Sequence, residues 1–349
     1  MFKLNLKIAL RNLWKNKGFS LINIGGLAIG LASCMVLLIY VAYEWSYDKQ
    51  FANSDKTYVV YQNAEANGKI FSWAWTPNVM AKEAQEKITG VNYASHSTYP
   101  SSKLISAGDK KITSRVNFAD PSFVKILDYK FIKGNPNEVL KDVNTIILTE
   151  SFAKKLFGDE DPINKTVKLE NQDLLKVEAV IEDVPANSSI VFECLMPWAL
   201  FEKREEWARE PNWGNNMCLT IVQLKDNKYF EEANAEMKGI YNRNQKDNGS
   251  EALLHPLTKW HLYDNFENGK LVGGKIDQLR IFLMLAFCIL LIACVNFMNL
   301  STARSERRAK EVGVRKAIGS SRKSLIHQFF LESMLITFIA TVLAFIFSL

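Results

Sequence analysis

Residues Leu21 to Tyr43 read LINIGGLAIGLASCMVLLIYVAY, without a single charged side chain. Two further stretches, Ile281 to Ala303 and Ser333 to Leu349, also lack charge, and nearly all charged residues of the chain lie between these stretches. A helix of about 20 apolar residues spans the ~30 Å of bilayer hydrocarbon, and about 17 residues is the lower limit. The sequence therefore predicts three membrane-spanning helices, at 21–43, 281–303 and 325–349.

Basic residues are concentrated next to the apolar stretches. Residues 1–20 contain no acid and five basic residues: Lys3, Lys7, Arg11, Lys15 and Lys17. The short segment 304–324 carries eight basic residues and two acids, Glu306 and Glu311. Because basic residues in short flanking segments stay on the cytoplasmic side of a membrane, we expect residues 1–20 and 304–324 in the cytoplasm. The large segment 44–280 is then extracytoplasmic.

The first apolar stretch has two alternative interpretations. A cleaved secretory signal also begins with basic residues, but its apolar core is typically about 7 to 15 residues long, shorter than 21–43. Leu31-Ala32-Ser33-Cys34 resembles the motif that precedes a lipidated cysteine, yet the apolar run continues through Met35 to Tyr40, where a lipoprotein turns polar. We therefore expect a retained helix. A mature protein beginning at Cys34 would have a different topology.

Two features near the N-terminus predict packing surfaces. Four basic residues of 1–20 recur at every fourth position, which is typical of an amphipathic helix lying on the inner membrane surface; a solvated charged face is the alternative. Gly26 and Gly30 form a G-x-x-x-G pattern within 21–43. This pattern lets another helix approach closely, although glycine is also frequent in membrane helices without that role.

The segment 44–280 has the pattern of a folded domain. β-branched and aromatic residues predict five strands, at 57–61, 145–148, 176–181, 190–192 and 219–224. Helical spacing predicts helices at 77–88, 150–157 and 229–241. Pro77 falls in the first turn of its helix, where a missing N–H costs nothing. Strand-rich stretches with segregated helices indicate an α+β domain with two lobes.

The sequence contains no recognisable catalytic or metal-binding constellation. It has no G-x-S-x-G elbow and no glycine-rich phosphate loop. His255 and His261 share a loop with Asp264, but their separation of six residues is not the i, i+4 spacing of a helical metal pair. We therefore expect ordinary surface histidines, with no catalytic residue, cofactor, metal site or bound nucleic acid.

Tryptophans and cysteines of the outer segment leave alternatives open. Tryptophans either line a sugar or peptide groove or, more often, fill a core; those of the outer segment are Trp73, Trp75, Trp198, Trp207, Trp213 and Trp260. Cys194 and Cys218 are the cysteines of the same segment. A disulfide between them is chemically permitted outside the cytoplasm, but spacing alone does not show that two residues meet.

Three stretches of the outer segment resemble a known family. Residues 121–136 read PSFVKILDYKFIKGNP, 148–166 read LTESFAKKLFGDEDPINKT and 181–189 read IEDVPANSS. They are similar to the periplasmic core domain of the FtsX/MacB class of ABC transporter permeases. Asn164 stands where that family usually has glycine, and asparagine also tolerates a left-handed turn.

The predicted cytoplasmic segment resembles the same family. Residues 299–321 read NLSTARSERRAKEVGVRKAIGSS, similar to the segment in which the family forms a coupling helix on its ATP-binding subunit. The resemblance assigns ATPase coupling to Glu311, Val312, Gly313, Arg315, Lys316, Ala317, Ile318 and Gly319. An apolar edge beside basic side chains suits a groove on a partner, whereas a basic loop held by lipid phosphates is the alternative.

The resemblance implies a multi-pass permease subunit of the inner membrane that transmits the ATP-driven motion of a separate ABC ATPase to a periplasmic domain, for efflux or mechanotransmission. Hydrolysis is expected in that ATPase, since the sequence has no G-x-x-x-x-G-K-[ST] loop. Other implied partners are a second permease half or copy, the lipid bilayer and, as an open alternative, a periplasmic adaptor. The sequence ends inside the third apolar stretch, where family members continue to a fourth helix, so we expect a partial or two-half chain.

Two functions from other classes compete with this interpretation. A membrane sensor would combine the outer domain with a sizeable cytoplasmic effector, and only the short segment 304–324 is present. A membrane-anchored enzyme would need a catalytic constellation. A neighbouring gene for an ABC ATPase would favour the permease over both.

Overall fold

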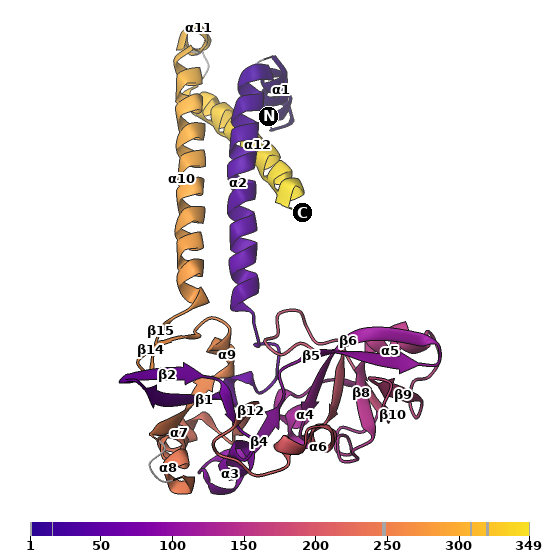
Figure 1. Cartoon of the computed structure of the whole chain (residues 1–349). Coiled ribbons are helices and arrows are strands. Elements are labelled where there is room, and N and C mark those ends of the chain that lie inside the picture. Colours follow the sequence, from indigo (N-terminus) through magenta and orange to yellow (C-terminus); the bar gives the residue numbers. More distant parts are fainter. Residues whose placement is uncertain (1, 16, 246–248, 308, 319–320, 349) are drawn as a thin grey trace. The chain divides into compact units, whose positions relative to one another are not determined.

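The computed structural model describes residues 2–15, 17–245, 249–307, 309–318 and 321–348 (Figure 1). The chain divides into two compact units. Residues 1–43 and 276–349 form a helical unit, and residues 44–275 form an α+β unit. The α+β class predicted from the sequence is confirmed.

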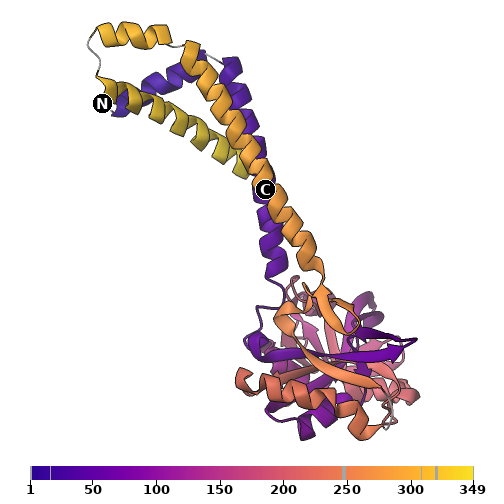
Figure 2. The same ribbon diagram turned by 90° about the vertical axis from the view of Figure 1, so that its left-hand side faces the viewer.

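Three helices of the described chain are long and apolar enough to cross a membrane, as predicted. They are α2 (Lys17–Trp45), α10 (Lys275–Arg307) and α12 (Arg322–Ser348). Two shorter helices, α1 (Phe2–Lys15) and α11 (Ala309–Ala317), lie before α2 and between α10 and α12 in the chain (Figure 2). α10 starts six residues before the apolar stretch that begins at Ile281.

Small side chains form the core of the helical unit. Leu27 and Ala28 of α2 pack with Ala293 of α10 and Ala340 of α12. Lipid tails are as apolar as leucine, so membrane helices associate mainly through close van der Waals packing, which small residues permit.

The α+β unit contains a sheet of 13 strands and a separate hairpin, counted over the described residues. The strands of the large sheet are β1 (Thr57–Ala66), β2 (Lys69–Trp73), β3 (Trp75–Pro77), β4 (Val91–Ser97), β5 (Ser101–Ala107), β6 (Lys110–Ala119), β7 (Phe131–Lys133), β8 (Thr145–Thr149), β9 (Thr166–Leu169), β10 (Asp173–Ile181), β11 (Cys194–Pro197), β12 (Asn216–Leu224) and β13 (Ser250–Pro256). The hairpin pairs β14 (Asn265–Glu267) with β15 (Lys270–Gly273).

Six strands close on themselves to form one lobe. Their order is β11-β8-β10-β9-β5-β6, and β11 also pairs with β6. Alternate side chains of these strands form a buried apolar core, in which Ile105, Leu148 and Val177 are completely buried. α5 (Glu150–Phe157) adds Phe152 and Leu156 to this core. Closure pairs the edges that an open sheet would leave exposed.

The second lobe is built on β4, β12, β1 and β13. α3 (Met80–Lys87), α7 (Phe230–Lys238) and α8 (Ile240–Asn244) supply helical residues to its core, which contains Met80, Met237 and Tyr241. Between β4 and β6, the strands at the boundary of the lobes, one residue pair is assigned, Ser97 with Ala119.

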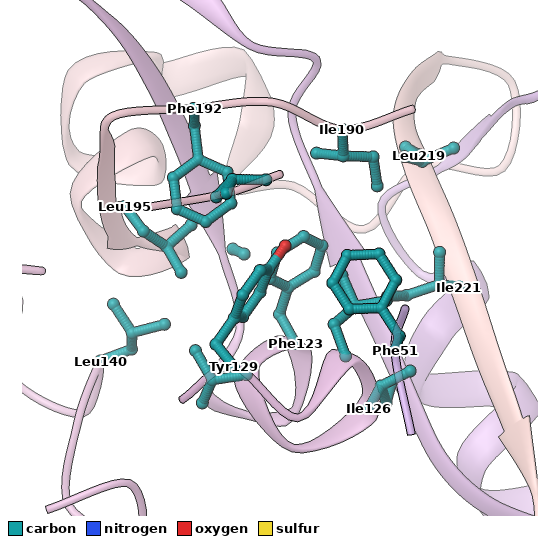
Figure 3. Packing of buried hydrophobic residues seen from close by; sticks show 14 of the residues in the cluster. Phe51, Phe123, Ile126, Tyr129, Leu140, Ile190, Phe192, Leu195, Leu219 and Ile221 are labelled. Carbon is teal, nitrogen blue, oxygen red and sulfur yellow. The ribbon is translucent and has the colours of Figure 1, made fainter. Parts of the chain in front are cut away.

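A third core, which crosses this boundary, is rich in aromatic rings. Tyr129 lies among Phe51, Phe123 and Phe192, with ring centroids 5.5 to 6.1 Å apart (Figure 3). The same cluster includes residues of β1 and β12 and residues of β8, β10 and β11. α4 (Pro121–Leu127) contributes Phe123 and Ile126 to it. The remaining helices are α6 (Trp198–Arg204) and α9 (Leu257–Trp260).

Several element predictions were wrong in detail. Residues 190–192 are not a strand: Ile190 and Phe192 are buried loop residues, and β11 begins at Cys194. Pro77 ends β3 instead of opening a helix, because α3 begins at Met80. The helix predicted at 229–241 is divided into α7 and α8 at Gly239.

A substitution of Gly134 tests how closely the backbone packs against β10 in the first lobe. Its φ of +96° disfavours any side chain, and an added Cβ would lie 2.6 Å from the Cβ of Ala179 in β10. We expect Gly134→Ala to lower the free energy of unfolding by ~2 kcal/mol or more. Gly108→Ala is the matched control, because Gly108 also has positive φ but open space around it. Equal losses in urea unfolding of the two purified variants would contradict the close packing at Gly134.

Candidate functional site

A buried carboxylate joins the two ends of the α+β unit. Glu44, in the last turn of α2, is 4% exposed. Its Oε2 lies 2.7 Å from Nζ of Lys275, the first residue of α10, and 2.5 Å from Nε2 of His261. The ring of Tyr47 stacks on His261 at 3.5 Å with an interplanar angle of 5°. We refer to Glu44, Tyr47, His261 and Lys275 as the junction.

The junction pairs the Glu44 carboxylate, whose burial without a partner would destabilise the fold. A buried carboxylate costs several kcal/mol unless it is paired and hydrogen-bonded. Removal of one partner from such a pair typically destabilises a protein by about 3–5 kcal/mol, because the remaining charge is left buried. The end of α2 and the start of α10 are therefore held at one point of the α+β unit.

The residues that follow α2 are also fixed by hydrogen bonds to the loop 187–189. The Asp48 carboxylate accepts hydrogen bonds from the backbone N–H and the hydroxyl of Ser189, at 2.8 and 2.5 Å. Asn187 Nδ2 donates to Ser46 Oγ at 2.8 Å, and Gln50 Nε2 donates to Ser188 Oγ at 2.6 Å. Burial raises the pKa of Asp48, while the bonds from Ser189 act in the opposite direction.

The hydrogen bonds between residues 46–50 and the loop 187–189 give a structural role to the sequence motif 181–189. Residues 187–189 are the end of the stretch 181–189, which the sequence analysis singled out by resemblance alone. The contacts with residues 46–50 could not be found from sequence, since 141 positions separate the partners.

Gly26 and Gly30 of α2 face α10. A Cβ added to Gly30 would lie 2.5 Å from the Cβ of Ala293, and one added to Gly26 would lie 3.2 Å from Nδ2 of Asn296. Asn23, on the same helix, is 1% exposed, and its amide oxygen and nitrogen have no hydrogen-bond partner among the described residues. The sequence analysis did not single out this buried polar group, although a polar residue in an apolar helix is a recognisable signal.

The segment assigned to ATPase coupling forms α11. Val312, Gly313, Lys316 and Ala317 lie in this helix, and Ile318 follows it with 81% of its surface exposed. Val314, which the sequence analysis did not include, is also exposed. The backbone of Glu311 and Arg315 belongs to α11, whereas their side chains and all of Gly319 lie outside the described residues.

The expectation of ordinary surface histidines was wrong. His255, in β13, is buried between the rings of Tyr61 and Phe266, at centroid distances of 5.4 and 6.0 Å. Burial lowers its pKa from 6.5 to about 4. His96 is also largely buried, with Nδ1 3.0 Å from Asp120, and His261 belongs to the junction. No group of three His, Cys, Asp or Glu side chains suited to a metal occurs in the described part of the chain.

The tryptophans follow both of the alternatives left open by the sequence. Trp73, Trp75 and Trp260 line an open cleft of about 510 Å³, together with Tyr47 and His261 of the junction. Trp198 is a core residue, Trp213 packs against the core of the second lobe, and Trp207 is exposed.

Cys194 and Cys218 belong to the same buried core but carry free thiols, so no disulfide joins them. The Cys194 Sγ instead lies 3.5 Å from Ser114 Oγ. Burial raises the pKa of both thiols, which keeps them protonated and unreactive at neutral pH.

Two family models match the chain. The model of the MacB-like periplasmic core domain matches residues 20–240, and the model of the FtsX-like permease C-terminal matches residues 283–349. His261 and Lys275 of the junction lie between the two matched ranges.

Individual relatives are distant. The macrolide export ATP-binding/permease protein MacB of Neisseria meningitidis is 24% identical over 57% of this chain, which spans only 29% of that relative. The ABC transporter permease YknZ of Bacillus subtilis is 21% identical over 96% of this chain and 82% of its own length. The crystal structure of a permease-protein domain from Porphyromonas gingivalis covers 59% of this chain and 93% of that domain, with 23% identity and a TM-score of 0.52. This last likeness concerns the fold.

His255 predicts a pH dependence of stability. Its pKa is lower in the folded protein than in the unfolded chain, so the unfolded state takes up a proton first as the pH falls below 6.5. Stability is therefore complete above about pH 6.5 and declines towards pH 4, by roughly 3 kcal/mol in total. His255→Gln should lack this component. Urea unfolding of both proteins at a series of pH values measures the difference; parallel profiles would contradict the buried neutral histidine.

Proposed function

The chain belongs to the MacB/FtsX-like family of ABC transporter permeases, and on this premise we propose that it transmits the ATP-driven motion of a separate ATPase to its α+β unit. In this proposal α2, α10 and α12 span the inner membrane. Residues 1–20 and 304–324 are cytoplasmic, and the α+β unit is periplasmic. The transmitted motion serves efflux or mechanical work outside the cytoplasm.

The junction carries this proposal. α2 is one uninterrupted helix from Lys17 to Trp45, and its last turn contains Glu44. α10 is equally uninterrupted from Lys275 to Arg307. Because the partly exposed Lys275 ammonium pairs with the buried Glu44 carboxylate, a displacement of either helix acts directly on the α+β unit. Flexible linkers at these two positions would instead absorb the displacement.

The proposed partners follow from the family and from the charge pattern. We assign ATP hydrolysis to an ABC ATPase because the family consists of ABC transporter permeases, and the name of the Neisseria relative combines ATP-binding and permease functions. We assign contact with the ATPase to α11 and the residues that follow it, where Val314 and Ile318 present apolar surface beside Lys316. A second permease half or copy completes the assembly.

Substitution in α11 tests the coupling assignment. Glu311→Ala and Arg315→Ala should each weaken copurification with the partner ATPase at least ~10-fold, because loss of a charged interfacial contact costs about 2–5 kcal/mol. Lys228→Ala is the control, since this exposed lysine lies in the α+β unit. Undiminished, ATP-responsive copurification of both α11 variants would contradict the assignment.

Substitution in the junction tests transmission separately from binding. We expect Lys275→Met to keep the ATPase bound but to abolish the ATP-dependent change in trypsin sensitivity of residues 44–275. Arg280→Met is the matched control, because Arg280 lies on the same helix in an exposed ion pair with Asp277, 2.8 Å away. Exposed pairs contribute about 0–1 kcal/mol, so this control should behave as the unmodified protein. A normal trypsin response of folded Lys275→Met would contradict transmission through the junction.

A further inference from the structure

The open cleft of about 510 Å³ in the α+β unit gathers aromatic rings from distant parts of the sequence. The rings belong to Tyr47 after α2, Tyr61 of β1, Trp75 of β3, Tyr99 between β4 and β5, and Trp260 at the end of α9. We refer to these five residues and Asp264, which also lines the cleft, as the aromatic site. Only Tyr47 among them takes part in the junction.

Strand register places Tyr61 and Trp75 on one face of the large sheet. Trp75 is paired with Leu219 of β12, and directly paired residues of antiparallel strands point to the same side. Leu219 and Tyr61 belong to the same buried cluster. Trp75 therefore lies on the face that carries Tyr61, and with 40% of its surface exposed it offers ring surface to a ligand.

Contacts between the rings fix their positions. Trp260 Nε1 donates a hydrogen bond to Tyr61 Oη at 3.0 Å. The rings of Trp75 and Tyr99 pack with centroids 4.1 Å apart and an interplanar angle of 38°. A site whose side chains are already held loses little conformational entropy when a ligand binds.

Asp264 gives the aromatic site its negative charge. It is an exposed residue, and the backbone of Gly274 lies so close that an added Cβ would be 2.5 Å from Asp264 Oδ1. Burial raises the pKa of Tyr61 to about 12, and the nearby Asp264 carboxylate acts in the same direction. The Tyr61 hydroxyl is therefore uncharged at neutral pH.

No lysine or arginine is among the described residues that line this cleft. His261 does line it, but its Nε2 lies 2.5 Å from the buried Glu44 carboxylate and the ring of Tyr47 stacks on one of its faces. Lys275 is paired with the same carboxylate. The cleft thus combines aromatic rings and one carboxylate with no strongly basic side chain of its own.

We propose that the aromatic site binds a small organic ammonium ion of the methylated type. The faces of tryptophan and tyrosine rings attract a cation, tryptophan most strongly. The methyl groups of such an ion also bury apolar surface against the rings, and the Asp264 carboxylate supplies the opposite charge. The inference concerns the α+β unit alone and holds whether or not the chain couples to an ATPase.

A neighbouring cleft shows why the cation belongs on the Asp264 side. This second cleft, of about 360 Å³, shares Trp75 and Tyr99 but is also lined by Lys103 and Arg204. Basic side chains disfavour a cationic ligand, since like charges repel. The two clefts therefore offer the same pair of rings in opposite electrostatic surroundings.

Calorimetric titration of the purified full chain with choline tests the inference, in a detergent without an ammonium group. The control ligand is the uncharged tert-butyl analogue of choline, in which carbon replaces the ammonium nitrogen. Because only the cation gains from the ring faces and the carboxylate, choline should bind at least ~10-fold more tightly than its analogue.

Substitutions locate the bound ion. Asp264→Asn and Trp75→Leu should each weaken choline binding at least ~5-fold. Asp109→Asn and Trp207→Leu are the matched controls, because Asp109 is exposed in the turn between β5 and β6, Trp207 is 48% exposed, and neither lines the cleft. Both controls should bind choline as the unmodified protein does.

Four results would overturn the inference. They are no saturable binding of choline below ~10 mM, equal affinity for choline and its analogue, unchanged choline affinity in both site variants, and tighter binding of a neutral sugar, glucose, than of choline. Trypsin resistance of the α+β unit verifies that each variant is folded. The comparison of ligands on the unmodified protein decides the question even where a variant does not fold.

Discussion

The buried carboxylate of Glu44 imposes the constraint on which the rest of the structure depends. A charge with 4% of its surface exposed must be paired, and its partners here are the first residue of α10 and a histidine that follows α9. Both chain ends of the α+β unit are consequently fixed at one place. The hydrogen bonds of Asp48 and Asn187 also hold the residues that follow α2. These residues are therefore part of the α+β unit and not a flexible linker.

The α+β unit combines a closed lobe with a boundary at which strand pairing is short but is continued by hydrogen bonds from Thr98 N to Phe118 O and from Asp120 N to His96 O. Closure of six strands leaves that lobe without a free sheet edge between them. At the boundary, β4 and β6 share one assigned residue pair. Ser97 Oγ and Asn117 Nδ2, both buried near this boundary, have no hydrogen-bond partner among the described residues. The aromatic core around Tyr129 adds non-directional cohesion between the lobes.

Sequence patterns predicted what depends on local composition. Long uncharged stretches predicted α2, α10 and α12, and β-branched runs predicted β1, β8, β10 and β12. Polar strands such as β5, which reads SSKLISA, were missed because their pairing and not their composition makes them strands. The aromatic and β-branched run 190–192 was mistaken for a strand because its burial comes from packing in a loop. The junction was also out of reach, since 217 positions separate Glu44 from His261.

Packing within the helical unit differs in kind from packing at the junction. Gly30 meets Ala293 through small, uncharged surfaces that let the two helices approach closely. The Glu44–Lys275 pair is short and directional, and displacing Lys275 would leave the buried Glu44 carboxylate with one partner fewer. The two chain ends of the α+β unit are thus held by a directional contact, whereas the helical unit is packed through small apolar surfaces. The transmission proposed above depends on the directional contact, and a sensor whose signal begins in the α+β unit would depend on the same contact.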